Sequence, residues 1–121
     1  MYETQLDKST NLLRIAYSGR VSADEAKQAA EQLRLLLPDL KPGFRLLADL
    51  TALELMDVAS IPYIRLMMDL CNAGGVATIV RVIPDAHKDI GLNILSLFHY
   101  SDNVQIVTCK TLKEAMQALA A

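Results

Sequence analysis

The chain has 121 residues, of which 52% are hydrophobic and 21% are charged, and its formal net charge at pH 7 is −2. This length suits one domain, and the apolar content is enough for a core, which excludes an intrinsically disordered chain. The absence of a basic cluster excludes a typical nucleic-acid or anionic-membrane surface, and no apolar run is long enough to span a bilayer.

The first third of the chain predicts a hairpin followed by a helix. Residues 2–6 and 12–17 alternate or nearly alternate between apolar and polar types on either side of a polar turn, which is typical of two antiparallel strands. Ser22 and Glu25 have the spacing of a capping box, which opens a helix that ends at Pro38.

The middle of the chain predicts a buried strand followed by a helix. Residues 44–50 are dense in apolar side chains, which is typical of a central parallel strand, and Asp49 is expected near its carboxyl end. A short turn through residues 53–56 is expected to follow, and Asp57 or Ser60 is expected to cap a helix that ends at Asn72.

That helix carries two apolar stripes, which leave only about a third of its circumference polar. The stripe expected to pack on the sheet contains Ile61, Ile64, Met68 and Cys71. The second stripe needs cover from a neighbouring helix, a loop or another chain. We therefore predict an interface, with a homodimer as the expected assembly, at Tyr63, Met67 and Leu70. Ordinary packing under a neighbouring helix is the alternative explanation.

The remaining segments continue the alternation of strands and helices. Residues 76–83 are β-branched and apolar apart from Arg81, which predicts a second central strand. A third helix is expected to begin at Pro84, and residues 104–109 predict a last short strand. A second capping box at Thr111 opens the final helix. The resulting order, ββαβαβαβα, predicts an α/β domain with a mixed sheet.

The cysteines and histidines indicate neither a redox centre nor a metal site. Cys71 and Cys109 lack the spacing of a CxxC motif, and neither His87 nor His99 is paired with Cys or Asp at ligand spacing. No signal-like segment precedes Tyr2. We therefore expect a cytoplasmic protein with reduced thiols and no cofactor.

The stretch LELMDVASIPYIRLMMDLCNAGG, at residues 53–75, resembles the signature region of the STAS domain family, which includes the bacterial anti-sigma-factor antagonists. In that family a turn containing Asp-Ser-Ser-Gly leads into a helix that ends in Gly-Gly. The similarity continues in register at residues 18–21 and 111–118. The resemblance implies one STAS-like domain over residues 1–121, with helices mainly on one face of the sheet. It also implies a non-enzymatic interaction module, whose partner is a kinase-like anti-sigma factor, a related regulator or a second copy of the chain.

The turn departs from the family pattern where the regulatory members are phosphorylated. Their partner kinase modifies the first Ser of the turn, whereas Val58 and Ala59 occupy both Ser positions here and Ser60 replaces the Gly. We therefore expect that a STAS-type kinase does not phosphorylate this turn. Transfer of the acceptor role to the displaced hydroxyl of Ser60 is the alternative.

A second hypothesis is a small-ligand site for a lipid or an anion. Open α/β sheets place their ligands at the carboxyl ends of parallel strands. Asp49, Asp57, Ser60 and Arg81 are therefore a candidate ligand rim, together with the free N–H groups of the following helix. The alternative is an ion pair of Arg81 with Asp57 or Asp85 that only compensates a charge.

A catalytic or phospho-acceptor role has little support in the sequence. A receiver-like site would use Asp49 as the acceptor and Lys110 as its cation, but residues 12–19 contain no carboxylate to supply the acidic pair that such a site needs. The chain also lacks a P-loop, a nucleophile elbow and the spacing of a catalytic triad. We therefore expect no enzymatic activity.

Overall fold

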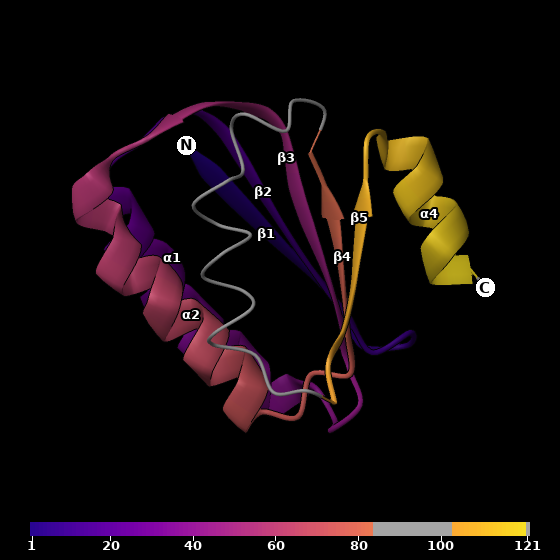
Figure 1. The fold of residues 1–121 in the computed structure, drawn as a ribbon. Coiled ribbons are helices and arrows are strands. Elements are labelled where there is room, and N and C mark those ends of the chain that lie inside the picture. Colours follow the sequence, from indigo (N-terminus) through magenta and orange to yellow (C-terminus); the bar gives the residue numbers. More distant parts are fainter. Residues whose placement is uncertain (84–102, 121) are drawn as a thin grey trace.

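A mixed sheet of five strands runs through the middle of the protein in the computed structural model, which describes residues 1–83 and 103–120 (Figure 1). The strands are β1 (Tyr2–Asp7), β2 (Leu12–Val21), β3 (Arg45–Met56), β4 (Thr78–Val82) and β5 (Gln105–Cys109). They lie side by side in the order β1-β2-β3-β4-β5, with β1 antiparallel to β2 and the other neighbours parallel. The predicted hairpin and the predicted mixed sheet are both confirmed.

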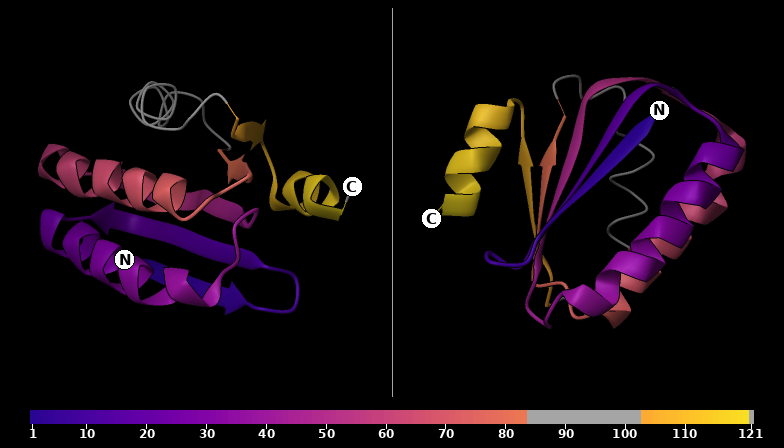
Figure 2. Two further views of the ribbon diagram at one scale, coloured as in Figure 1. Left: turned by 90° about the horizontal axis from the view of Figure 1, so that it is seen from below. Right: turned by 180° about the vertical axis from the view of Figure 1, so that it is seen from behind.

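Helices cover the two faces of this sheet unequally. The long helices α1 (Ala23–Leu36) and α2 (Ile61–Ala73) lie side by side on one face, and α4 (Leu112–Ala120) lies on the other (Figures 1 and 2). Short 3-10 turns, η1 (Leu37–Asp39) and η2 (Val58–Ser60), follow α1 and β3. The predicted fold class, an α/β domain with helices mainly on one face, is confirmed. The predicted third helix lies outside the described residues.

Two of the helix starts use the capping residues that the sequence predicts. The Ser22 hydroxyl accepts a hydrogen bond from the Glu25 backbone N–H at 3.2 Å, and Thr111 accepts one from Glu114 at 3.1 Å. Each hydroxyl thereby satisfies an N–H group that has no partner within its own helix. The Glu25 carboxylate also pairs with the α-ammonium group of Met1 at 2.9 Å, and this contact lowers the pKa of Glu25.

The end of α2 depends on a glycine that has no room for a side chain. Gly75 has a φ of +87°, and a Cβ atom there would lie 3.0 Å from the Cβ of Pro42. Its carbonyl accepts a hydrogen bond from the Gly43 N–H at 2.7 Å. This close approach joins the end of α2 to the segment before β3, so that β4 begins beside β3.

Alternation along the strands divides the buried residues into two layers. We call the side covered by α1 and α2 the α1/α2 face and the opposite side the α4 face. On the α1/α2 face, Leu46 and Ile79 belong to the larger core cluster, whereas Leu47 and Val80 belong to the smaller cluster under α4. Because successive side chains along a strand point to opposite faces, residues two positions apart in a strand lie in the same layer.

The strand β3 is longer than the sequence predicts. It continues to Met56. Its first half, residues 45–49, pairs with both β2 and β4, whereas its second half pairs with β2 and not with β4. The prediction of a short turn at residues 53–56 is therefore wrong. This extension places Asp49 in the middle of a strand and carries the following turn η2 away from β4.

Candidate functional site

The residues predicted as a ligand rim lie in three separate places. Asp49 lies two residues after Leu47 in β3 and therefore on the α4 face. Arg81 lies two residues after Ile79 in β4 and therefore on the α1/α2 face. Asp57 and Ser60 lie beyond the end of β3. The prediction that these four side chains converge is wrong, because it assumed that β3 ends near Asp49.

Asp49 is held in a local network on the α4 face. Its carboxylate accepts hydrogen bonds from the Thr51 backbone N–H at 3.0 Å and from the Thr51 hydroxyl at 2.5 Å. Arg14, on the neighbouring strand β2, lies 3.4 Å away and supplies the opposite charge. This network accounts for a carboxylate that is only 9% exposed. The cation beside Asp49 is thus Arg14 and not Lys110, which a receiver-like site would use. The sequence does not predict Arg14 there, because its place beside Asp49 depends on the pairing of β2 with β3.

Arg81 is a buried cation in the middle of β4. It is 6% exposed and stands between the core residues Ile79 and Ile83, and its Nη2 donates a hydrogen bond to the Thr108 hydroxyl at 2.9 Å. The predicted pair with Asp57 is wrong, because Asp57 accepts a hydrogen bond from Arg20 Nε at 2.9 Å. The other predicted partner, Asp85, lies outside the described residues.

The turn after β3 buries its hydroxyl and exposes its apolar residues. Ser60 is 0% exposed, and its Oγ donates a hydrogen bond to the carbonyl oxygen of Asp57 at 2.5 Å. Neither Ser60 nor Asp57 caps α2 through its side chain, so that prediction is wrong. Val58, by contrast, is 85% exposed, and Ala59 beside it is also exposed.

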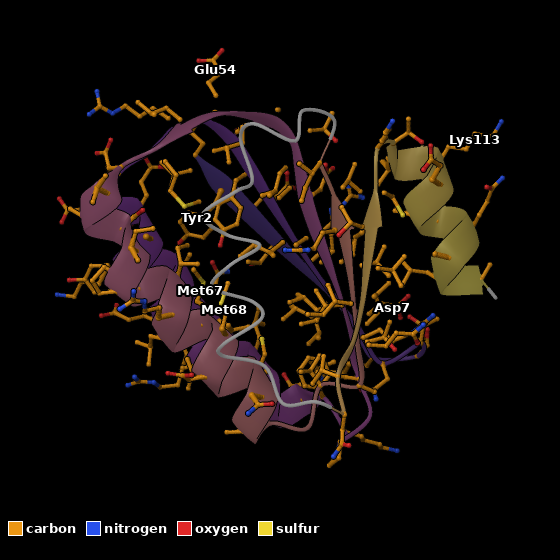
Figure 3. The ribbon with its side chains drawn as sticks, in the orientation of Figure 1. Tyr2, Asp7, Glu54, Met67, Met68 and Lys113 are labelled. Carbon is orange, nitrogen blue, oxygen red and sulfur yellow. The ribbon has the colours of Figure 1, made fainter. Side chains whose placement is uncertain are left out.

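A second exposed apolar residue lies just before this turn. Leu55, near the end of β3, is 55% exposed, and the neighbouring Glu54 projects into solvent (Figure 3). The ion pair of Arg20 and Asp57 joins the adjacent ends of β2 and β3. We call the exposed apolar residues Leu55, Val58 and Ala59 the β3–η2 surface. The sequence pattern does not single out Leu55, because its exposure depends on the extension of β3.

The apolar surplus of α2 is mostly buried within the protein. Met67, predicted to lie in an interface, is 6% exposed and accepts a hydrogen bond from the Tyr17 hydroxyl at 3.6 Å, so the assignment of Met67 to an outer stripe is wrong. The reason is that α2 packs against both the sheet and α1, which together cover a wider arc than one neighbour would. Tyr63 and Leu70 are half-buried, and their part in an interface remains a prediction.

Two reactive groups in this layer are shielded from water. Burial raises the pKa of the Cys71 thiol to about 12 and also raises the pKa of the Tyr17 hydroxyl. Both groups are therefore neutral at physiological pH, which makes Cys71 a poor nucleophile.

The described residues hold no group of three His, Cys, Asp or Glu side chains arranged to bind a metal ion. In the same part of the chain, no helix has the length and hydrophobicity needed to cross a membrane.

Solved structures with this fold include anti-sigma factor antagonists. The chain is similar to the anti-sigma factor antagonist SpoIIAA in its unphosphorylated form, with a TM-score of 0.70 and 10% identity over 100% of this chain and 99% of that one. A protein of the DUF3478 family from Shewanella loihica, which has a SpoIIAA-like fold, gives a TM-score of 0.71 and 13% identity over 98% and 93% of the two chains.

An anti-sigma factor antagonist from Mycobacterium paratuberculosis gives a TM-score of 0.63 and 16% identity over 100% of this chain and 96% of that one. Neither a protein-family model nor a curated protein matches the sequence. The chain therefore has the SpoIIAA-like fold that the resemblance to STAS domains implies.

Proposed function

We propose that this chain is a non-enzymatic, cytoplasmic interaction module that docks on a partner protein through the β3–η2 surface. The observation that carries the proposal is Val58, which is 85% exposed at the end of β3, with Leu55 55% exposed nearby. An apolar surface kept in water is typical of a site that another protein covers. The solved anti-sigma factor antagonists with this fold support a regulatory role.

The module acts without the serine phospho-switch. Val58 offers no hydroxyl where the surface is open, and the nearby hydroxyl of Ser60 is fully buried and bonded to the Asp57 carbonyl. A kinase would have to unfold the start of α2 to reach it. Docking is therefore controlled by the amount of the partner rather than by phosphate on this turn.

The chemistry of the surface favours a partner with a small apolar contact region. Val58 and Ala59 present aliphatic groups, while Arg20 and Asp57 at the edge neutralise each other in an ion pair. A partner therefore gains mostly from apolar burial, at about 25 cal/mol per Å² of area removed from water. A kinase-like regulator or a second copy of this chain meets that requirement.

Site-specific photo-crosslinking tests the proposal. A photoreactive amino acid replaces Val58 in one variant and Leu35 in a matched control, and both are irradiated in the cells that produce the protein. Leu35 is a suitable control because it is 77% exposed in the last turn of α1, about 20 Å along that helix from the end near η2. We expect a protein adduct at position 58 and none at position 35.

Mass spectrometry of the adduct then tells a second copy of this chain from another protein. No adduct at position 58, or equal adducts at both positions, would contradict docking through the β3–η2 surface.

A further inference from the structure

Within residues 1–83 and 103–120, the strand β1 pairs with β2 alone and therefore forms one edge of the sheet (Figure 2). An edge strand presents backbone N–H and C=O groups that no neighbouring strand uses. Natural proteins usually protect such an edge with a proline, a lysine or a β-bulge. Residues 2–7 contain neither proline nor lysine, and their pairing with β2 is regular from end to end.

The hydrogen bonds of the hairpin tell which backbone groups of β1 face outward. The Ser18 N–H donates to the carbonyl oxygen of Met1 at 2.8 Å, so these two residues form a hydrogen-bonded pair. Such pairs alternate with non-hydrogen-bonded pairs along an antiparallel ladder. The odd-numbered residues of β1 therefore bond to β2, and the even-numbered ones direct their N–H and C=O groups away from it. We call the latter the outward residues, which are Tyr2, Thr4 and Leu6.

The backbone groups of the outward residues form no hydrogen bond in the described part of the chain. Their side chains lie on the α1/α2 face, because their partners in β2, such as Ile15, belong to the larger core cluster. Tyr2 and Leu6 pack against this cluster and are still only half-buried. The charged residues of β1, Glu3 and Asp7, lie on the opposite face. A strand added at this edge would therefore bond to free backbone groups and also cover apolar side chains.

We propose that β1 pairs with β1 of a second copy of this chain, antiparallel and about a two-fold axis at Thr4. The two five-stranded sheets then form one continuous sheet. Thr4 lies opposite Thr4 of the second copy, and Tyr2 lies opposite the second copy's Leu6. Because each outward residue contributes a donor and an acceptor, this arrangement forms about six backbone hydrogen bonds. It also places apolar side chains opposite each other on the α1/α2 face.

Charge selects this register over its neighbours. Outward residues have to face outward residues, so the alignment can change only in steps of two positions. In the register centred on Thr4, Glu3 faces the second copy's Gln5. A step in one direction places the two Glu3 side chains opposite each other, and a step in the other direction places Glu3 opposite Asp7. Like charges directly opposite destabilise a strand pair, and larger steps lose most of the hydrogen bonds.

The interface is small and separate from the β3–η2 surface. A standard interface buries about 800 Å² per partner, and one pair of six-residue strands buries less, so the dimer should be weak and depend on protein concentration. β1 pairs with residues 12–17 of β2, whereas Leu55 of the β3–η2 surface pairs with Arg20. The proposal therefore stands independently of partner docking.

Amide hydrogen exchange measured by NMR on the unmodified protein is the first test. At micromolar protein concentration, the amide hydrogens of the odd-numbered residues of β1 should be protected and those of the outward residues should not. At millimolar concentration, the amide hydrogens of the outward residues should exchange at least about threefold more slowly, because the second copy then accepts their hydrogen bonds.

Oxidative crosslinking tests the register. Thr4→Cys should form a disulfide-linked dimer, because facing Cα atoms of a hydrogen-bonded pair lie about 5.5 Å apart, within the range of a disulfide. Leu6→Cys is the matched control and should not crosslink, because the two copies of position 6 lie roughly 13 Å apart in this register. Both variants retain Cys71 and Cys109, which are buried.

A proline at the edge tests the backbone contacts. Thr4→Pro removes an N–H that faces away from β2, so the hairpin keeps its own ladder. Because each copy loses one hydrogen bond, sedimentation equilibrium should show a dimer at least about tenfold weaker than that of the unmodified protein. Circular dichroism checks that the variant is folded.

Outward residues whose amide hydrogens stay unprotected at millimolar concentration would overturn the proposal. Crosslinking of Leu6→Cys as readily as Thr4→Cys would also overturn it, since the strands would then have no fixed register. An undiminished dimer in a folded Thr4→Pro variant would show that the two copies meet elsewhere.

Discussion

Replacing Met67 by alanine distinguishes a buried α2 from an α2 that forms an interface. Met67 is 6% exposed, so truncation removes a side chain that packs in the larger core cluster and leaves a space there. The Tyr17 hydroxyl also loses its sulfur partner. Both effects act within one protein chain, and neither requires a second copy.

The expected loss of stability follows from these contacts. A buried Met→Ala change lowers the free energy of unfolding by about 2–5 kcal/mol. Because the Tyr17 hydroxyl also loses its hydrogen bond to the sulfur, we expect a loss above the lower limit of this range, at about 3 kcal/mol. With an unfolding entropy of about 2.1 cal/mol/K per residue, a chain of 121 residues loses about 4 °C in Tm per kcal/mol. The variant should therefore melt about 12 °C below the unmodified protein.

Urea unfolding and thermal unfolding, both followed by circular dichroism, measure the free energy of unfolding and Tm. Light scattering measures the oligomeric state. Leu35→Ala is the control, because its side chain is 77% exposed and should change the free energy of unfolding by less than about 0.5 kcal/mol. A loss below about 1 kcal/mol for Met67→Ala, or a changed oligomeric state with unchanged stability, would refute the assignment of Met67 to the core.

Two further predictions concern the buried hydroxyl and the buried thiol. Ser60→Ala removes the hydrogen bond to the Asp57 carbonyl and should lower the free energy of unfolding, measured in urea, by about 1 kcal/mol. In the unmodified protein, peptide mapping after co-expression with a STAS-type kinase should find no phosphate on Ser60. Phosphate there would show that the hydroxyl becomes accessible. In a Cys109→Ala variant, Cys71 should resist a thiol reagent at pH 8 until urea unfolds the chain, because its pKa of about 12 leaves almost no thiolate. Rapid modification of the native variant would contradict this burial.

Local patterns in the sequence predict most of the elements that the structure describes. The hairpin follows from alternation on both sides of a polar turn, and the starts of α1 and α4 follow from Ser22 and Thr111. These signals are local because a strand pattern or a helix cap involves residues only a few positions apart.

The errors arise where distant parts of the chain decide the outcome. β3 continues to Met56 because β2 pairs with it there, and a run of mixed polar and apolar residues does not reveal that partner. The face that Asp49 and Arg81 occupy depends in turn on where their strands begin and end. Likewise, the burial of Met67 depends on α1 lying beside α2, which the helix pattern alone allows but does not require.

The division of the core by the sheet gives the protein two cooperative units of unequal strength. The layer under α4 is the smaller cluster, and Arg45 supports it by donating hydrogen bonds to the carbonyl oxygens of Leu119 in α4 and Thr10 in the hairpin turn. Because α4 belongs to the smaller cluster, we expect it to detach while the larger layer stays folded. In hydrogen exchange, we therefore expect the amide hydrogens of α4 to exchange through a partial opening, and those of β2 and β3 to exchange only when the whole domain unfolds.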